Sequence, residues 1–374
     1  MKRQIIINSI YILALFILSA ILDFNLLIPM MLAVIFIYLE VWKKRMASDA
    51  RFLHLVLLFL IIFAIGHWGL EKGLSIVFIP FSIVSMLVIL LWNDLMVSLL
   101  MALICSFTLG IEYHSLDMVI IFFTSAVIST IVLLNVRRRS QIIRAGFIAG
   151  LIQALTWLFI KEFAIINYLD PYAYLVINGA ACGILVAGLL PVFESIFGRV
   201  TNISLLELSD FNQPVLKRLM LEAPGTYHHS LVVGNLSEIA CEAVGANSLL
   251  ARIGSYYHDI GKIEKAEYFN ENQNLGVSKH EDLSPSMSKL VIINHVKEGE
   301  VIAKRYRINS RIIDFIRQHH GKSLVYYFYH RALENGAESE KIHEEGFRYP
   351  GPKPETKETA MSFWLIPWKR LRVL

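Results

Sequence analysis

Histidines and one aspartate recur in the second half of this 374-residue chain, most of them where helices are expected to end. In chain order they are His229, His258, Asp259, His295, His319 and His320. These side chains offer nitrogen and oxygen atoms and no thiolate, which disfavours a closed structural zinc site and suits iron, manganese, cobalt or catalytic zinc. A single histidine would be a weak indication, since histidines are common on surfaces and in cores. The ordered set predicts a metal site.

The adjacent pair His258 and Asp259 indicates what such a site could do. Neighbouring residues on an α-helix point about 100° apart, so the carboxylate can lie between two metals while the imidazole binds one of them. Two divalent metals can hold a phosphate group and generate a hydroxide directed at phosphorus. The pattern therefore favours hydrolysis of a phosphate ester.

Helices are expected to carry these residues. Start and stop signals define helices at about 226–245, 247–261, 284–299 and 310–321. Ser284 and Pro285 fit an N-cap and a first helical position, and a glycine closes each of these helices. Helix C-termini carry partial negative charge, which favours cations near the histidines placed there. Because no stretch alternates convincingly with period two, this half is expected to be all-helical.

The first half of the chain has a different composition. Long apolar runs fill the sequence up to Phe197, whereas the residues from Gly198 onward have the composition of a soluble domain. A membrane-spanning helix needs about 20 mostly apolar residues. The expected spans are 5–22, 26–42, 52–70, 74–92, 95–111, 117–136, 145–163 and 172–197. Asn135 and Gln153, inside these runs, are expected to hydrogen-bond between helices.

Basic residues predict the orientation of these spans. The segments on one side are rich in Lys and Arg, including Arg137–Arg139 and Arg199, whereas those on the other side hold only Lys72 and Lys161. This positive-inside pattern places both termini and the soluble half in the cytoplasm. The lipid bilayer is therefore an expected partner.

Cysteine usage and net charge add little about partners. Cys105, Cys182 and Cys241 are far apart and form no paired spacing, so no disulfide framework is expected. The net charge of +4 is modest, and the basic residues lie mostly at membrane boundaries. A nucleic-acid partner is therefore not expected.

Four stretches resemble a known family. They are "HHSLVVGNLSEIA", "YYHDIGKIEKAEYFNENQ", "LSPSMSKLVIINHVKEG" and "DFIRQHHG". They are similar to the HD-domain (HDIG) metal phosphohydrolases that have a seven-transmembrane region, typified by bacterial cyclic di-AMP phosphodiesterases. The resemblance covers roughly 26–360 and implies that the six residues of the set are the metal ligands. It further implies that Asp259 bridges two metals, that Lys262 contacts substrate phosphate, and that His228 is not a ligand.

The resemblance implies a domain organisation. An N-terminal transmembrane helix (1–25) precedes a seven-transmembrane region (26–198), a cytoplasmic HD domain (199–360) and a tail (361–374). Only Asp23–Asn25 separate the first two spans, so the extracytoplasmic domain common in the family is expected to be absent. The tail "MSFWLIPWKRLRVL" has no acidic residue where the family supplies a further aspartate ligand. The HD domain is therefore expected to be C-terminally truncated and the tail aberrant.

The resemblance also implies a reaction. The chain is expected to hydrolyse cyclic di-AMP to the linear dinucleotide at a bacterial plasma membrane, using two divalent transition metals, with iron or manganese favoured. Activity is expected to be impaired because the last carboxylate is missing. Two alternatives remain open: a catalytically inactive protein that binds nucleotide or metal, and an HD phosphohydrolase for another nucleotide. The sequence leaves the oligomeric state open.

Overall fold

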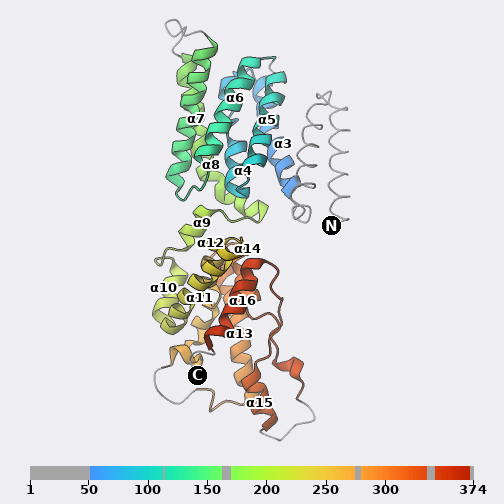
Figure 1. Ribbon diagram of the computed structural model, residues 1–374, viewed down its shortest axis with the longest axis vertical. Coiled ribbons are helices and arrows are strands. Elements are labelled where there is room, and N and C mark those ends of the chain that lie inside the picture. The colour runs from blue at the N-terminus through green and yellow to red at the C-terminus, as the bar shows by residue number, and fades with distance from the viewer. Residues whose placement is uncertain (1–50, 113, 162–169, 274–278, 335–341, 371–374) are drawn as a thin grey trace. The chain divides into compact units, whose positions relative to one another are not determined.

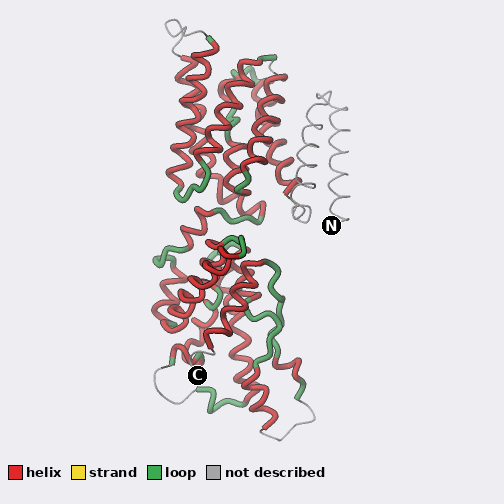
Figure 2. The backbone as a smooth tube through the Cα atoms, in the orientation of Figure 1, coloured by secondary structure: helices red, strands yellow, loops and turns green. Residues whose placement is uncertain are grey.

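The computed structural model describes residues 51–112, 114–161, 170–273, 279–334 and 342–370. The chain divides into two compact units, Met1–Phe197 and Gly198–Leu374. The described residues form helices and no strand apart from one isolated bridge between Leu324 and Arg348 (Figures 1 and 2). The predicted all-α class is confirmed. The spans predicted at 5–22 and 26–42 lie outside the described residues.

Helices also make up the described part of the first unit. In chain order they are α3 (Arg51–Glu71), η1 (Ile76–Phe78), α4 (Ile83–Trp92), α5 (Leu95–Glu112), α6 (Leu116–Val132), α7 (Arg139–Ile160) and α8 (Asp170–Phe197). The run predicted as one span at 74–92 comprises two helical segments, η1 and α4. Pro80 separates the short turn η1 from α4 because proline lacks a backbone donor and its ring clashes with the preceding turn.

Close contact between α7 and α8 depends on glycine. A Cβ on Gly150 would overlap the backbone of Val176, and one on Gly179 would overlap the backbone of Gly150. Small residues allow such backbone contact between apolar helices. By length and composition, α7 and α8 are the two described helices that could cross a membrane, and shorter apolar stretches lie within α3 to α6.

Polar side chains connect the helices of this unit. As predicted, Gln153 of α7 hydrogen-bonds to its neighbours, donating to the Ser125 hydroxyl of α6 at 3.0 Å and to the Asn178 amide oxygen of α8 at 3.5 Å. The prediction for Asn135 is wrong. Asn135 lies beyond the end of α6 with a φ of 58°, in the left-handed region that asparagine tolerates in turns.

The second unit is a bundle of helices. In chain order they are α9 (Asn202–Leu208), α10 (Pro214–Glu222), α11 (Pro224–Ala243), α12 (Ser248–Tyr257), η2 (Ile260–Tyr268), η3 (Asn270–Asn272), α13 (Pro285–Arg305), α14 (Ser310–Gln318), α15 (Tyr326–Glu334), η5 (Glu344–Phe347) and α16 (Lys357–Arg370). Its core gathers apolar side chains from α9 to α14, among them Leu219, Tyr257, Ile302 and Ile316. Burying such side chains contributes about 1.5–3 kcal/mol each.

The predicted helix starts agree well with the structure, and the ends less so. Ser284 caps α13 by accepting a hydrogen bond from the Met287 amide, as its position predicted. The predicted end of that helix at Gly299 is wrong, because α13 continues to Arg305. Similarly, α12 ends at Tyr257, and His258 and Asp259 form the sharp junction that leads into η2.

Gly261 and Gly299 explain how this junction meets α13. A Cβ on Gly261 would overlap the carbonyl oxygen of His295 and the amide nitrogen of Gly299. The first turn of η2 therefore rests directly on the backbone of α13. This contact brings the residues before Gly261 next to the middle of α13, where His295 lies.

The last described helix, α16, packs against α11, α12 and α14. Its buried Ser362 bonds to the hydroxyls of Ser255 on α12 at 2.8 Å and Ser237 on α11 at 3.4 Å. The domain boundary expected at residue 360 falls inside this helix. Residues on both sides of that boundary contribute to the packing of the second unit.

Substitution Gly261→Ala should destabilise the second unit by about 1–3 kcal/mol, the usual cost of overpacking. The new methyl group would push η2 away from α13 and so separate His258 from His295. Thermal unfolding of the full chain in detergent would measure the change. Gly346→Ala is a matched control, because a Cβ there meets nothing within 4 Å. Equal unfolding midpoints for Gly261→Ala and wild type would contradict the close contact between Gly261 and α13.

Candidate metal centre

Helix ends and one helix middle bring the six predicted ligands together. His229 comes from the second turn of α11, and His295 from the middle of α13. His258 and His319 are the C-cap residues of α12 and α14. Asp259 and His320 follow these caps directly.

The ligands form two groups that share one carboxylate. One group holds Asp259, His295, His319 and His320, and the other holds His229, His258 and Asp259. Within each group the candidate ligand atoms all lie within 4.8 Å of one another. The shared residue, Asp259, lies at the junction between α12 and η2.

The two oxygens of Asp259 face different groups. Oδ1 lies 3.2 Å from Nε2 of His295 and 3.3 Å from Nε2 of His319. Oδ2 lies 3.0 Å from Nε2 of His258 and 4.0 Å from Nε2 of His229. A carboxylate in this position can bind a cation through each oxygen.

Backbone carbonyls orient three of the imidazoles. Nδ1 of His258 lies 2.7 Å from the carbonyl oxygen of Ser255. Nδ1 of His295 lies 2.5 Å from that of Ile292, and Nδ1 of His319 lies 2.8 Å from that of Ile316. A carbonyl only accepts, so Nδ1 carries the proton and Nε2 presents a lone pair to the centre. This is the usual arrangement behind histidines that bind metals.

The resulting set of lone pairs fits a cation. Nε2 of His295 and Nε2 of His319 are only 3.1 Å apart, and both face Oδ1 of Asp259. Three acceptors therefore converge without a proton between them. Among the described residues, His258 Nε2 and Asp259 Oδ1 are buried atoms without a hydrogen-bond partner. Leaving a buried acceptor unpaired costs about 1–3 kcal/mol, which a bound metal would offset.

Protonation also favours metal binding. Burial lowers the pKa of His229 to about 3 and that of His319 to about 4, so both imidazoles are neutral at pH 7. Burial acts to raise the pKa of Asp259, but the charged ammonium group of Lys262 beside it holds that pKa well below its ordinary value. The centre thus combines neutral nitrogen ligands with an ionised carboxylate, which transition metals accept.

Lys262 lies beside the shared carboxylate. Its ammonium group is 2.8 Å from Oδ2 of Asp259 and 2.6 Å from Oε1 of Glu271. Although burial acts to lower it, the two carboxylates raise the pKa of Lys262 above its ordinary value. The lysine therefore remains charged, with one of its three protons left for a further acceptor.

Sequence reasoning assigned two residues of this site no contact with the candidate ligands or Lys262. Glu271, from η3, accepts from Lys262 and from the Thr226 hydroxyl of α11 at 3.2 Å. Tyr349 stacks on the ring of His320, with centroids 4.1 Å apart and planes 17° from parallel. Both residues lie outside α-helices in segments without hydrophobic periodicity, so their spacing alone did not indicate that they reach the ligands.

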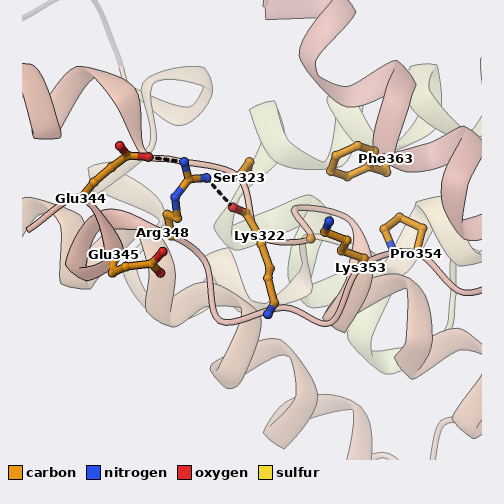
Figure 3. Close-up of a pocket in the computed structure, with 9 residues that line it drawn as sticks. Lys322, Ser323, Glu344, Glu345, Arg348, Lys353, Pro354 and Phe363 are labelled. Atoms are coloured by element: carbon orange, nitrogen blue, oxygen red, sulfur yellow. Dashed lines mark hydrogen bonds and ion pairs between the residues drawn. The ribbon is translucent and has the colours of Figure 1, made fainter.

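A surface hollow begins next to the ligand His320. Gly321 lines it together with Lys322, Arg348 and Phe363. Figure 3 shows Arg348 between Glu344, with which it forms an ion pair, and the backbone of Lys322, whose carbonyl accepts from it at 3.0 Å. None of the six predicted ligands lines this hollow.

Two family models match the chain, one after the other. Residues 18–201 match the family model described as "7TM receptor with intracellular HD hydrolase", and residues 226–355 match the HD domain, a metal-dependent hydrolase. The chain belongs to this family of membrane proteins in which an HD hydrolase domain follows a seven-transmembrane region.

Relatives within the family are known by name. The chain is similar to the cyclic-di-AMP phosphodiesterase PgpH of Bacillus subtilis, with 50% identity over 186 residues, and to that of Listeria monocytogenes, with 42% identity over 242 residues. These matches cover 50% and 63% of the chain but only 26% and 33% of the two relatives. The chain therefore spans about a quarter to a third of their length.

A solved structure is also similar. The L. monocytogenes PgpH HD domain in complex with cyclic-di-AMP is 44% identical, and the match covers 43% of this chain and 76% of that one with a TM-score of 0.41. A second structure of the same domain matches at 42% identity, covering 43% of this chain and 74% of that one, with a TM-score of 0.40.

Substitution Asp259→Asn should reduce the metal content of the purified chain to background. The amide removes the only negative charge among the six ligands and places a donor against neighbouring lone pairs. Elemental analysis per mole of protein would measure this. Asp282→Asn, which alters an exposed carboxylate before α13, should leave metal content unchanged. Wild-type metal content in Asp259→Asn would contradict the assignment of Asp259 as the shared ligand.

Proposed function

We propose that this chain is a membrane-anchored, metal-dependent phosphodiesterase that hydrolyses cyclic di-AMP to the linear dinucleotide. The observation that carries the proposal is the single carboxylate of Asp259, whose two oxygens face two groups of imidazoles. That arrangement suits two divalent transition metals, with iron or manganese favoured by the nitrogen and oxygen ligands. The identity to PgpH relatives supports a cyclic dinucleotide as the substrate.

The residues of the centre have separable roles in this reaction. His295, His319 and His320 would hold one metal, His229 and His258 the other, and Asp259 would bind both. When bound, such metals supply Lewis acidity and lower the pKa of a coordinated water. The reaction adds the hydroxyl of water to phosphorus and its remaining proton to the leaving ribose oxygen.

Lys262 is suited to binding the substrate phosphate. Its side chain is 4% exposed and its ammonium already contacts two carboxylates, so its position is fixed. A fixed charge beside the reacting phosphate needs little rearrangement when negative charge increases in the transition state. Lys262 therefore acts as an electrostatic partner for the phosphate rather than as a base.

A catalytically inactive protein that binds nucleotide or metal is the main alternative. The absence of acidic residues from Met361–Leu374, where the resembled family supplies a further carboxylate, motivated that hypothesis. Two divalent metals bring four positive charges, and Asp259 offsets one of them. Binding of metal without turnover would favour the alternative, and the impaired activity remains a prediction.

Turnover should depend on this centre. The metal-loaded full chain in detergent should convert cyclic di-AMP to the linear dinucleotide, and His258→Ala should lower kcat/KM at least about 100-fold, the scale of a lost first ligand in metal catalysis. Chromatography of the nucleotides would measure this. His330→Ala on α15, outside both ligand groups, is the control. Full metal occupancy without turnover by wild type would favour the binding-protein alternative.

The basic residues at the membrane boundaries also support a location and an orientation for the chain. We place the chain in the bacterial plasma membrane as a multi-pass protein, with the HD domain and Lys262 in the cytoplasm. The support is the excess of basic residues in segments such as Arg137–Arg139 and Arg199.

A reporter enzyme fused after Gly198 should be active only when that enzyme works in the cytoplasm. The positive-inside pattern predicts this, because Arg199 and the residues after it are then retained on the inner side. A cytoplasmic and an extracytoplasmic reporter fused at the same position would serve as mutual controls. Activity of only the extracytoplasmic reporter would reverse the orientation.

A further inference from the structure

Glu271 and Asn272 of η3 contact the start of α11 and hold it against the segment that follows Lys262 in sequence. The N-cap position of α11, Ala223, provides no side-chain cap. Instead, Asn272 accepts from the Thr226 amide at 2.9 Å and donates to the Thr226 hydroxyl at 2.9 Å. A Cβ on Gly225 would overlap the carbonyl oxygen of Glu271, so the two segments are in backbone contact. His229 follows one turn later on the helix fixed in this way.

An ion pair also connects the segment that holds Glu271 and Asn272 to the metal centre. Glu271 Oε1 lies 2.6 Å from Lys262 Nζ, and Lys262 in turn lies 2.8 Å from Oδ2 of Asp259. That oxygen belongs to the group with His229 and His258. Lys262 and any cation bound by these residues would therefore both contact the same oxygen, Oδ2 of Asp259.

An ammonium group in this position opposes metal binding unless its charge is offset. Two positive charges a few ångströms apart repel strongly in a buried site, where the dielectric constant is low. A second carboxylate on the lysine reduces that repulsion and leaves Oδ2 available. The side chain of Glu271 is 30% exposed, so it lies at the edge of the site while Lys262 is buried within it.

We propose that Glu271 is a positioning residue of the metal centre: it neutralises Lys262 and so allows Asp259 to bind a cation together with His229 and His258. This inference rests on the proposed function, because it assumes that the two ligand groups hold metals. It assigns Glu271 no contact with substrate. The paired Lys262 and Glu271 would allow a cation to bind beside them, whereas Lys262 alone would repel it.

Titration of the metal-free full chain in detergent with Mn²⁺, followed by the electron paramagnetic resonance signal of free Mn²⁺, tests the proposal. Glu271→Gln should weaken one of the two binding events about 10- to 100-fold, the usual effect of a partner behind the ligands, and leave the other unchanged. The matched control is Glu267→Gln, whose carboxylate forms an exposed ion pair with Lys279 at 3.6 Å. It should bind Mn²⁺ as wild type does.

The lysine provides the decisive comparison. Lys262→Met should bind Mn²⁺ at least as tightly as wild type, and Lys262→Met/Glu271→Gln should match Lys262→Met, because Glu271 then has no charge to offset. Wild-type binding by Glu271→Gln, or equally weak binding by the double variant and Glu271→Gln, would overturn the inference. If Glu271→Gln does not fold, weaker binding by Lys262→Met than by wild type would overturn it. Failure of the wild-type chain to bind Mn²⁺ would instead refute the proposed metal centre, and this inference with it.

Discussion

Repulsion between acceptor atoms is the constraint on which the second unit depends. Asp259 and the imidazoles around it present lone pairs to one another at distances of 3.0 to 3.3 Å, with the Nδ1 protons of His258, His295 and His319 engaged by carbonyls on the far side. Such a set is unfavourable without a positive charge at its centre. The fold must therefore hold these groups together against their own repulsion, and Lys262 supplies part of the charge.

Two glycines allow the backbone to hold the ligands this close together. Gly261 rests on α13 beside His295, and Gly225 rests on η3 beside Glu271. Each contact brings a helix or turn that carries ligands closer to its neighbour than a residue with a Cβ would permit. The ligands thus converge because backbones touch on two sides of Asp259, and the hydrophobic core behind them, including Tyr257 and Ile316, keeps these contacts closed.

Helix starts and the convergence of the six candidate ligands could be predicted from sequence, because both depend on residue type at short spacing. The cap at Ser284 and the start of α14 at Ser310 are examples. The end of α13 could not be predicted in the same way, since Gly299 looks like a stop signal but serves close packing against Gly261. Glu271 and Tyr349 were missed because their roles arise from tertiary contacts with Lys262 and His320.

The shared carboxylate has a thermodynamic consequence. Because one oxygen of Asp259 faces His258 and the other faces His295, a ligand that reorients this side chain from one side changes the binding free energy on the other. Linkage requires the effect to be reciprocal: whatever factor the first cation imposes on the affinity for the second, the second imposes on the first. Two sites built on one rotatable group cannot have independent affinities, so occupancy of this centre is set jointly by both cations.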